Sequence, residues 1–135
     1  MNRGPVPRTL LVSACASLLL TGCVYFNTVY NAKELYRETE LARLAGQDTA
    51  LAERYREVID KASRAYSEDA GGKWSDDALL LIGQAQLRRR ALREAEEAFE
   101  SVLEATDNPV VRRQATLYLG AVDVASGRPA LGAPL

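Results

Sequence analysis

Histidine is absent from the 135-residue chain, and cysteine occurs only twice. The chain therefore lacks the side chain that proteins use most often as a general base and as a metal ligand. It also lacks a glycine-rich phosphate loop and any spacing of side chains that is typical of a metal site. We expect no enzymatic activity and no bound cofactor or metal, because the usual catalytic groups are missing.

A concentrated basic face is also missing, since 17 basic residues are balanced by 18 acidic ones. Nucleic-acid binding requires such a face to replace the counterions of the phosphates, so we expect no nucleic-acid partner. The apolar run Thr9–Leu20 has 12 residues. A spanning helix needs about 20 apolar residues, which argues against a permanent transmembrane anchor.

Residues 1–22 instead have the organisation of a signal peptide. Arg3 and Arg8 form a basic head before the apolar run, which ends in small residues. The junction Leu20-Thr21-Gly22-Cys23 resembles the bacterial lipobox, in which the cysteine receives lipid. Cys15 leaves with the signal peptide, so lipidation would occupy the sulfur of the one remaining cysteine. Anchoring by two or more acyl chains would be stable, and an uncleaved signal segment is the alternative.

The residues after the junction predict a short tether, a helical domain and a tail. Residues 23–31 form the lipidated tether, whose aromatic side chains Tyr25, Phe26 and Tyr30 either lie at the membrane interface or pack on the first helix. Residues 32–126 form the helical domain, and residues 127–135 form the tail. The helices are predicted at residues 32–45, 48–67, 75–89, 91–105 and 109–126.

Polar side chains at the helix ends have structural interpretations. Ser75 is expected to cap the third helix, and Asp76 with Asp77 suits its first turn better than a catalytic pair, because adjacent helical residues diverge. Trp74 is expected to pack between repeats. The run Arg88–Arg90 either interacts with the helix dipole or meets an acidic partner. A solvated face is expected for Glu94, Glu96, Glu97 and Glu100.

The second and fourth predicted helices repeat one pattern after a shift of 33 residues. The shift superposes Ile59 on Leu92, Ala62 on Ala95 and Tyr66 on Phe99. A period near 34 residues with short loops is typical of stacked helix pairs. We therefore predict an all-α fold, a tetratricopeptide-like α-solenoid of about five helices behind a lipoprotein signal peptide.

Residues 79–102 resemble a tetratricopeptide repeat. The residues at the packing positions of that family are Leu79, Ile82, Gly83, Ala95, Phe99 and Val102. A wider resemblance, carried by Cys23–Ala32 and Lys73–Gly83, is to BamD-like tetratricopeptide lipoproteins of the outer membrane. The residue after the cysteine is Val24 and not aspartate, which resembles the pattern of lipoproteins that bacteria with two membranes sort to the outer membrane.

This resemblance implies a scaffold that is lipid-anchored on the periplasmic face of the outer membrane. Its partners would be proteins of the cell envelope, among them the β-barrel assembly machinery, and its role would lie in outer-membrane protein assembly. The alternative is a structural envelope-maintenance lipoprotein that links the outer membrane to peptidoglycan or to a secretion complex.

The fifth predicted helix is apolar around nearly its whole circumference, unlike an ordinary surface helix. Its apolar residues are Val110, Val111, Ala115, Leu117, Tyr118, Leu119, Ala121, Val122, Val124 and Ala125. Either another chain covers this helix, or the sequence lacks a following helix and leaves an apolar patch exposed.

Overall fold

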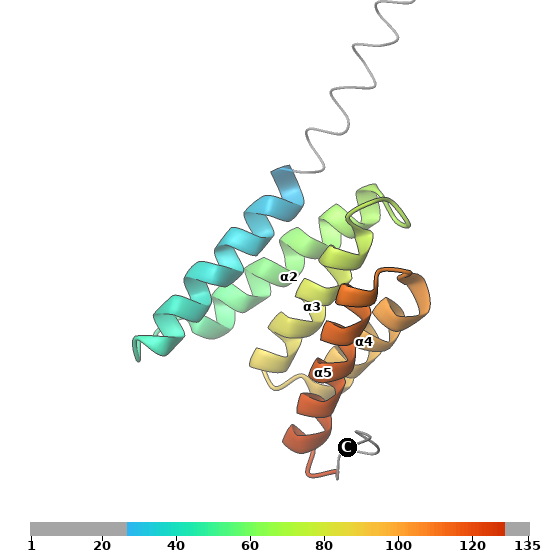
Figure 1. The fold of residues 1–135 in the computed structure, drawn as a ribbon. Coiled ribbons are helices and arrows are strands. Elements are labelled where there is room, and N and C mark those ends of the chain that lie inside the picture. The colour runs from blue at the N-terminus through green and yellow to red at the C-terminus, as the bar shows by residue number, and fades with distance from the viewer. Residues whose placement is uncertain (1–26, 129–135) are drawn as a thin grey trace, which may run out of the picture.

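The computed structural model describes residues 27–128, which form five helices and no strand (Figure 1). The first helix covers residues 27–44 of this range. It is followed by α2 (Leu51–Glu68), α3 (Ser75–Arg88), α4 (Leu92–Ala105) and α5 (Pro109–Ala125). The prediction of an all-α fold is therefore confirmed, and α2 to α5 begin and end within three residues of their predicted limits.

One predicted boundary and one predicted helix cap are wrong. Residues 27–31, which we expected within the tether, are helical, so the first helix includes them. Ser75 is the first residue of α3 and not its cap, since the cap position belongs to Trp74 and the Ser75 hydroxyl donates a hydrogen bond of 2.8 Å to the Gly72 carbonyl. The signal peptide, Cys23, Tyr25 and Phe26 lie outside the described residues, as does most of the predicted tail.

The ends of α5 follow from its sequence. The Asn108 side chain accepts a hydrogen bond of 2.9 Å from the Val110 amide, and Pro109 occupies the first helical position, as predicted. Proline suits this position because its missing amide hydrogen would have no helical partner there. At the other end, Gly127 adopts a φ of 71°, which glycine tolerates without steric strain and which stops the helix.

The helices stack in chain order, with α2 against α3, α3 against α4 and α4 against α5. Figure 1 shows the first helix beside α2, with successive helices running in opposite directions. In addition, α3 contacts α5. The helix α3 is thus central, and it buries residues toward two sides, with Leu81 and Ala85 facing the first helix and α2, and Leu80 facing α4 and α5.

The core consists of two main groups of buried side chains on opposite sides of α3. The first group joins α3, α4 and α5 and is centred on Phe99, which is fully buried and stacks on Tyr118 with a centroid distance of 5.2 Å. The second group joins the first helix, α2 and α3 through Ala32, Ala62 and Leu81. A smaller cluster of Val29, Ala65 and Ala78 lies near the start of α3. Consequently the first helix and α5 contribute to different parts of the core.

Candidate functional site

The six residues predicted from the repeat motif all lie in the core or against it. Ala95, Phe99 and Val102 are fully buried in the group that joins α3, α4 and α5, and Leu79 packs against that group. Ile82 packs on the opposite side, against the first helix and α2. These six residues are therefore packing residues in the structure. The predicted lipidation site Cys23 lies outside the described residues.

Gly83 explains how closely α3 and α4 approach. A Cβ atom at this position would lie 2.5 Å from Cε1 of Phe99, which is too close for any side chain. Phe99 cannot easily yield, because it is fully buried and stacked on Tyr118. Glycine at this point lets the ring pack directly against the backbone of α3.

The two acidic residues at the start of α3 point to different neighbours. Asp77 forms an ion pair of 3.1 Å with Lys33 of the first helix, whereas Asp76 faces a surface pocket. The expectation that this pair diverges is confirmed.

Trp74 packs on the cluster that contains Ala78. Ammonium groups lie over its ring, with Lys73 Nζ 4.8 Å from the ring centroid. The start of α3 is therefore fixed to the first helix.

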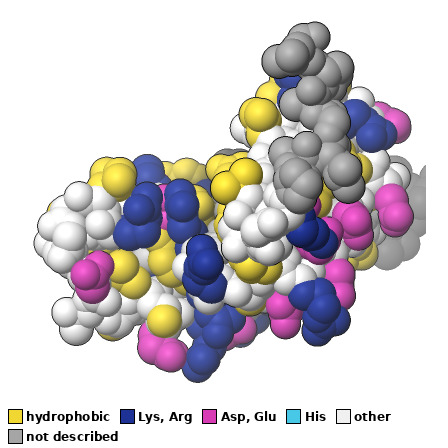
Figure 2. Space-filling model, turned by 90° about the horizontal axis from the view of Figure 1, so that it is seen from below, with side chains coloured by type: hydrophobic (Ala, Val, Ile, Leu, Met, Phe, Trp, Pro, Cys, Tyr) yellow, Lys and Arg dark blue, Asp and Glu magenta, His cyan; other side chains and the backbone are white. Residues whose placement is uncertain are grey.

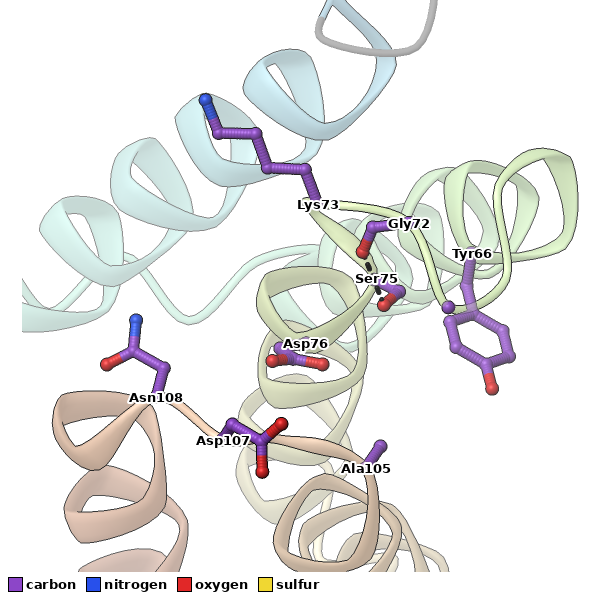
Figure 3. Close-up of a pocket in the computed structure, with 9 residues that line it drawn as sticks. Tyr66, Gly72, Lys73, Ser75, Asp76, Ala105, Asp107 and Asn108 are labelled. Atoms are coloured by element: carbon purple, nitrogen blue, oxygen red, sulfur yellow. Dashed lines mark hydrogen bonds between the residues drawn. The ribbon is translucent and has the colours of Figure 1, made fainter.

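The pocket lies between the α2–α3 loop and the α4–α5 loop, and its volume is about 350 Å³ (Figure 3). Its walls are formed by Tyr66, Gly71, Gly72, Lys73, Ser75, Asp76, Ala105, Asp107 and Asn108. In Figure 3 the amine of Lys73 points away from the pocket, so Asp76 and Asp107 supply its charged groups. Both carboxylates lie near helix N-termini, where the helix dipole stabilises negative charge.

This pocket is at the small end of the range of ligand sites, about 300–1,000 Å³. Its walls are mainly polar, unlike the mostly apolar walls of typical small-molecule sites. Residues 27–128 contain no group of three or more histidine, cysteine or acidic side chains that could hold a metal ion. No helix within that range is both long enough and apolar enough to cross a membrane.

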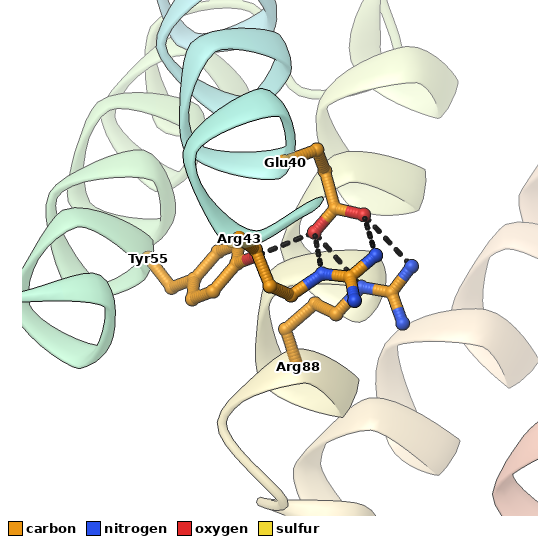
Figure 4. Close-up of polar contacts among 4 residues, drawn as sticks. All are labelled: Glu40, Arg43, Tyr55 and Arg88. Atoms are coloured by element: carbon orange, nitrogen blue, oxygen red, sulfur yellow. Dashed lines mark hydrogen bonds and ion pairs between the residues drawn. The ribbon is translucent and has the colours of Figure 1, made fainter. Parts of the chain in front are cut away.

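A polar cluster joins the first helix to α2 and α3 (Figure 4). The Glu40 carboxylate accepts two hydrogen bonds from Arg88 of α3, at 2.9 Å from Nε and 2.8 Å from one terminal nitrogen. It accepts further hydrogen bonds from Arg43, one helical turn away, and from the Tyr55 hydroxyl of α2. Only 17% of the Glu40 side chain is exposed, so these contacts are partly shielded from water.

The surroundings of Glu40 change the proton affinities of several groups. Burial by itself would raise the pKa of Glu40, but the hydrogen bonds from Arg43, Tyr55 and Arg88 hold this pKa below its ordinary value. Burial and then the negative charge of Glu40 raise the pKa of Tyr36 to about 12. Burial and the hydrogen bond to Glu40 also raise the pKa of Tyr55. At neutral pH the cluster therefore combines one ionised carboxylate with two guanidinium groups and neutral phenols.

Sequence reasoning missed this cluster. The pair of Glu40 and Arg43, three residues apart, suggests no more than a local contact on one helix. The sequence predicts that Arg88 interacts with the helix dipole or with an acidic partner, and the structure places it on an acidic residue of the same chain. The prediction of a solvated face is confirmed for Glu94, Glu97 and Glu100, which are exposed. Glu96 is half-buried and pairs with Arg128 at 2.8 Å. No local sequence signal connects residues 40 and 88, because only the helix stack brings them together.

Large hydrophobic side chains are exposed on both outer helices of the stack. Leu41 and Leu44 are exposed near the end of the first helix, and Val110, Leu117 and Val124 are exposed on α5. The exposed fractions of the three α5 residues are 51%, 74% and 72%. Figure 2 shows one face of the molecule, on which hydrophobic side chains reach the surface in several places between Lys and Arg. The other side of α5 packs into the core through Val111, Ala115 and Val122.

No known protein family, curated protein or solved structure shows a significant match to this chain.

Proposed function

We propose that this chain is a lipid-anchored scaffold that binds other proteins on the periplasmic face of the outer membrane, with a role in outer-membrane protein assembly. The observation that carries the proposal is the exposure of large hydrophobic side chains on both outer helices of the stack, at Leu41 and Leu44 and on α5. Grouped apolar side chains on a protein surface are typical of interaction sites. The signal peptide and the junction at Cys23 supply the anchor and the compartment.

The arrangement of the helices supports a tetratricopeptide-like solenoid as the fold of this scaffold. In stacked helix pairs, each helix packs on its neighbours in sequence, and the first helices of successive pairs also meet. The contact of α3 with α5 agrees with such a stack if α3 and α5 each begin a pair. Ala62 and Ala95, which the 33-residue shift superposes, are both fully buried.

The anchor is tested by expressing the tagged full chain and a Cys23→Ala variant in a bacterium with two membranes. We expect the unsubstituted chain in the outer-membrane fraction, with an intact mass that shows signal-peptide removal and added acyl groups. The variant is expected to lose the acyl groups and to be absent from the outer-membrane fraction. An unmodified full-length mass of the unsubstituted chain would contradict the proposal.

The binding role is tested by crosslinking in intact cells and purifying the tagged chain from the outer membrane. We expect β-barrel proteins or their assembly components to be enriched relative to an unrelated lipoprotein. Replacing Leu41 and Leu44 by glutamate should reduce this enrichment without unfolding the chain, because both side chains are exposed. Identical sets of captured proteins from the chain and from the unrelated lipoprotein would contradict the role in assembly.

A further inference from the structure

Four arginines lie at the end of the stack where the first helix and α3 both finish. Arg43 is in the last turn of the first helix, and the run Arg88–Arg90 ends α3. Arg43 and Arg88 share the carboxylate of Glu40, at 3.1 and 2.8 Å (Figure 4). One negative charge is thus divided between two guanidinium groups, so these three side chains together carry a surplus positive charge.

The other two arginines have no acidic partner within residues 27–128. Arg89 donates one hydrogen bond of 3.4 Å to the side chain of Gln86. The side chain of Arg90 forms no hydrogen bond or ion pair in that range. The four guanidinium groups therefore face one paired carboxylate, that of Glu40, which leaves three positive charges without a counter-charge.

Neighbouring negative charges do not cancel this surplus. Glu53 at the start of α2 pairs with Arg56, and Glu97 of α4 pairs with Arg93. Asp48, in the loop before α2, forms no ion pair in the described part of the chain, and counting it would still leave two positive charges. The dipole at the end of α3 is equivalent to only about half a negative charge.

The backbone of Arg90 shows that an arginine is held here against the local conformational preference. Arg90 adopts a φ of 64°, in the left-handed region that favours glycine. Its amide donates to the Leu87 carbonyl at 3.0 Å, and the Ala91 amide donates to the Gln86 carbonyl at 3.0 Å, which is the usual way in which a glycine ends a helix. Within residues 27–128 no contact of the guanidinium group offsets this strain, so a partner outside the chain would have to supply the contact.

An exposed leucine adjoins the arginines. Leu44 follows Glu40 by four residues, so both lie on the same side of the first helix. Leu44 is 71% exposed. Figure 2 views this end of the stack and shows hydrophobic side chains at the surface beside Lys and Arg. We name Leu44, Arg43 and Arg88–Arg90 together the basic end patch.

We propose that the basic end patch binds an acidic segment of a partner protein, in which carboxylates flank a large apolar side chain. The carboxylates pair with Arg89 and Arg90, and the apolar side chain packs on Leu44. Arginine suits this role because its guanidinium group binds a carboxylate through two parallel hydrogen bonds. The inference rests on the proposed function of a protein-binding scaffold and gives the chemistry of one of its partners.

The position of the patch favours a protein over the phosphate groups of lipids. The first helix extends over about 27 Å between residues 27 and 44, at 1.5 Å per residue. The proposed lipid anchor at Cys23 precedes the start of this helix, whereas the patch lies at its end. With the anchor at Cys23, the membrane is nearer to the start of the helix than to the patch.

Peptide binding to the full chain, purified from membranes in a neutral detergent, tests the proposal. The probe is a fluorescently labelled synthetic peptide in which glutamates flank leucines. Fluorescence anisotropy should show binding that weakens as salt is added, and no binding of the same peptide with glutamine in place of each glutamate. A chain with both Arg89→Gln and Arg90→Gln should bind about tenfold more weakly, because two exposed ion pairs are lost.

The matched control carries both Arg64→Gln and Arg113→Gln, which remove two exposed arginines of α2 and α5 outside the patch. This control changes the net charge equally and should leave peptide binding unchanged. Leu44→Ala should weaken binding of the leucine peptide but not of the same peptide with alanine in place of each leucine.

Arg90→Gly separates binding from folding. Glycine suits the left-handed φ at this position, so the variant should unfold at a higher temperature than the unsubstituted chain. The same variant should bind the peptide more weakly, and its raised stability excludes unfolding as the cause. Unchanged peptide binding by Arg90→Gly would contradict the role given to this side chain.

Other outcomes would overturn the patch in recognisable ways. Equal weakening by the two double substitutions would show a general effect of net charge. If no peptide binds, but vesicles of phosphatidylethanolamine and phosphatidylglycerol bind through Arg89 and Arg90, the ligand is a lipid phosphate. If no peptide binds, but glutamate at Leu41 and Leu44 still reduces crosslinking in cells, the patch is wrong and the proposed function stands. If the peptide binds as expected, but crosslinking enriches no β-barrel or assembly protein, the patch stands and the role in assembly is wrong.

Discussion

Glu40 shows how one side chain can hold three helices together. It lies on the first helix, and its hydrogen-bond donors are Arg88 on α3, Tyr55 on α2 and Arg43 on its own helix. A carboxylate with two guanidinium partners and little exposure is more strongly bound than a typical surface ion pair. The sequence indicated none of this, because residues 40 and 88 become neighbours only after the helices have stacked.

We expect Glu40→Gln to lower the free energy of unfolding by about 2 kcal/mol, because it removes the charged acceptor and leaves Arg88 without its carboxylate. The measurement is urea denaturation at neutral pH. Glu57→Gln is the matched control, since Glu57 forms an exposed ion pair with Lys61 at 3.4 Å, and its loss should change the free energy by less than about 0.5 kcal/mol. Equal effects of the two substitutions would mean that the cluster is no stronger than an exposed pair.

The same carboxylate should make stability depend on pH. The pKa of Glu40 in the folded chain lies below its ordinary value of 4.5, so its contribution is complete above that value and is lost as the pH falls through the folded pKa. Urea denaturation at a series of pH values below 4.5 should therefore show a steeper loss of stability in the unsubstituted chain than in Glu40→Gln. The exposed pair of Glu34 and Arg37 is present in both chains, so its contribution cancels in the difference. Parallel pH profiles would contradict the role given to Glu40.

At the scale of single helices, the two glycines within α3 and α5 have opposite roles. Gly83 lets α3 approach Phe99, whereas Gly120 faces open space on α5. We expect Gly83→Ala to lower the free energy of unfolding by about 1–3 kcal/mol through overpacking, despite the higher helix propensity of alanine. Gly120→Ala should raise it by up to about 1 kcal/mol, because it restricts the unfolded chain and meets no neighbour. Thermal and urea unfolding of both variants give this comparison, and a stabilising Gly83→Ala would show that the contact with Phe99 can relax.

Helix positions were predictable because their signals are local. Asn108-Pro109 begins α5 and Gly127 ends it, as the sequence indicated. The predicted first helix begins too late, because Val29 belongs to an aromatic and β-branched segment that indicates a tether. In the structure this residue is buried beside Ala65 and Ala78, so packing overrides the local preference. The outward face of α5 was predictable only as an excess of apolar residues, since helical periodicity alone does not say which side meets α4.

At the scale of the whole molecule, the core is divided by α3. The first helix packs on α2 and one side of α3, and α4 with α5 packs on the other side. The first helix is also fixed by polar contacts near both of its ends, through Lys33 with Asp77 and through Glu40 with Arg88. Since this helix follows the proposed lipid anchor in sequence, these contacts connect the anchor to the rest of the stack.

This division predicts that the first helix can loosen while α4 and α5 stay folded. We expect a chain with both Lys33→Ala and Glu40→Gln to show faster amide hydrogen exchange over residues 27–44, with unchanged exchange in α4 and α5. Arg128→Ala is the matched control, because it removes the ion pairs with Glu96 and Asp123 and should affect only the end of α5. If exchange instead rises equally in all helices of the double variant, the stack unfolds as one unit. In that case the polar contacts of the first helix stabilise the whole fold and do not merely hold one helix in place.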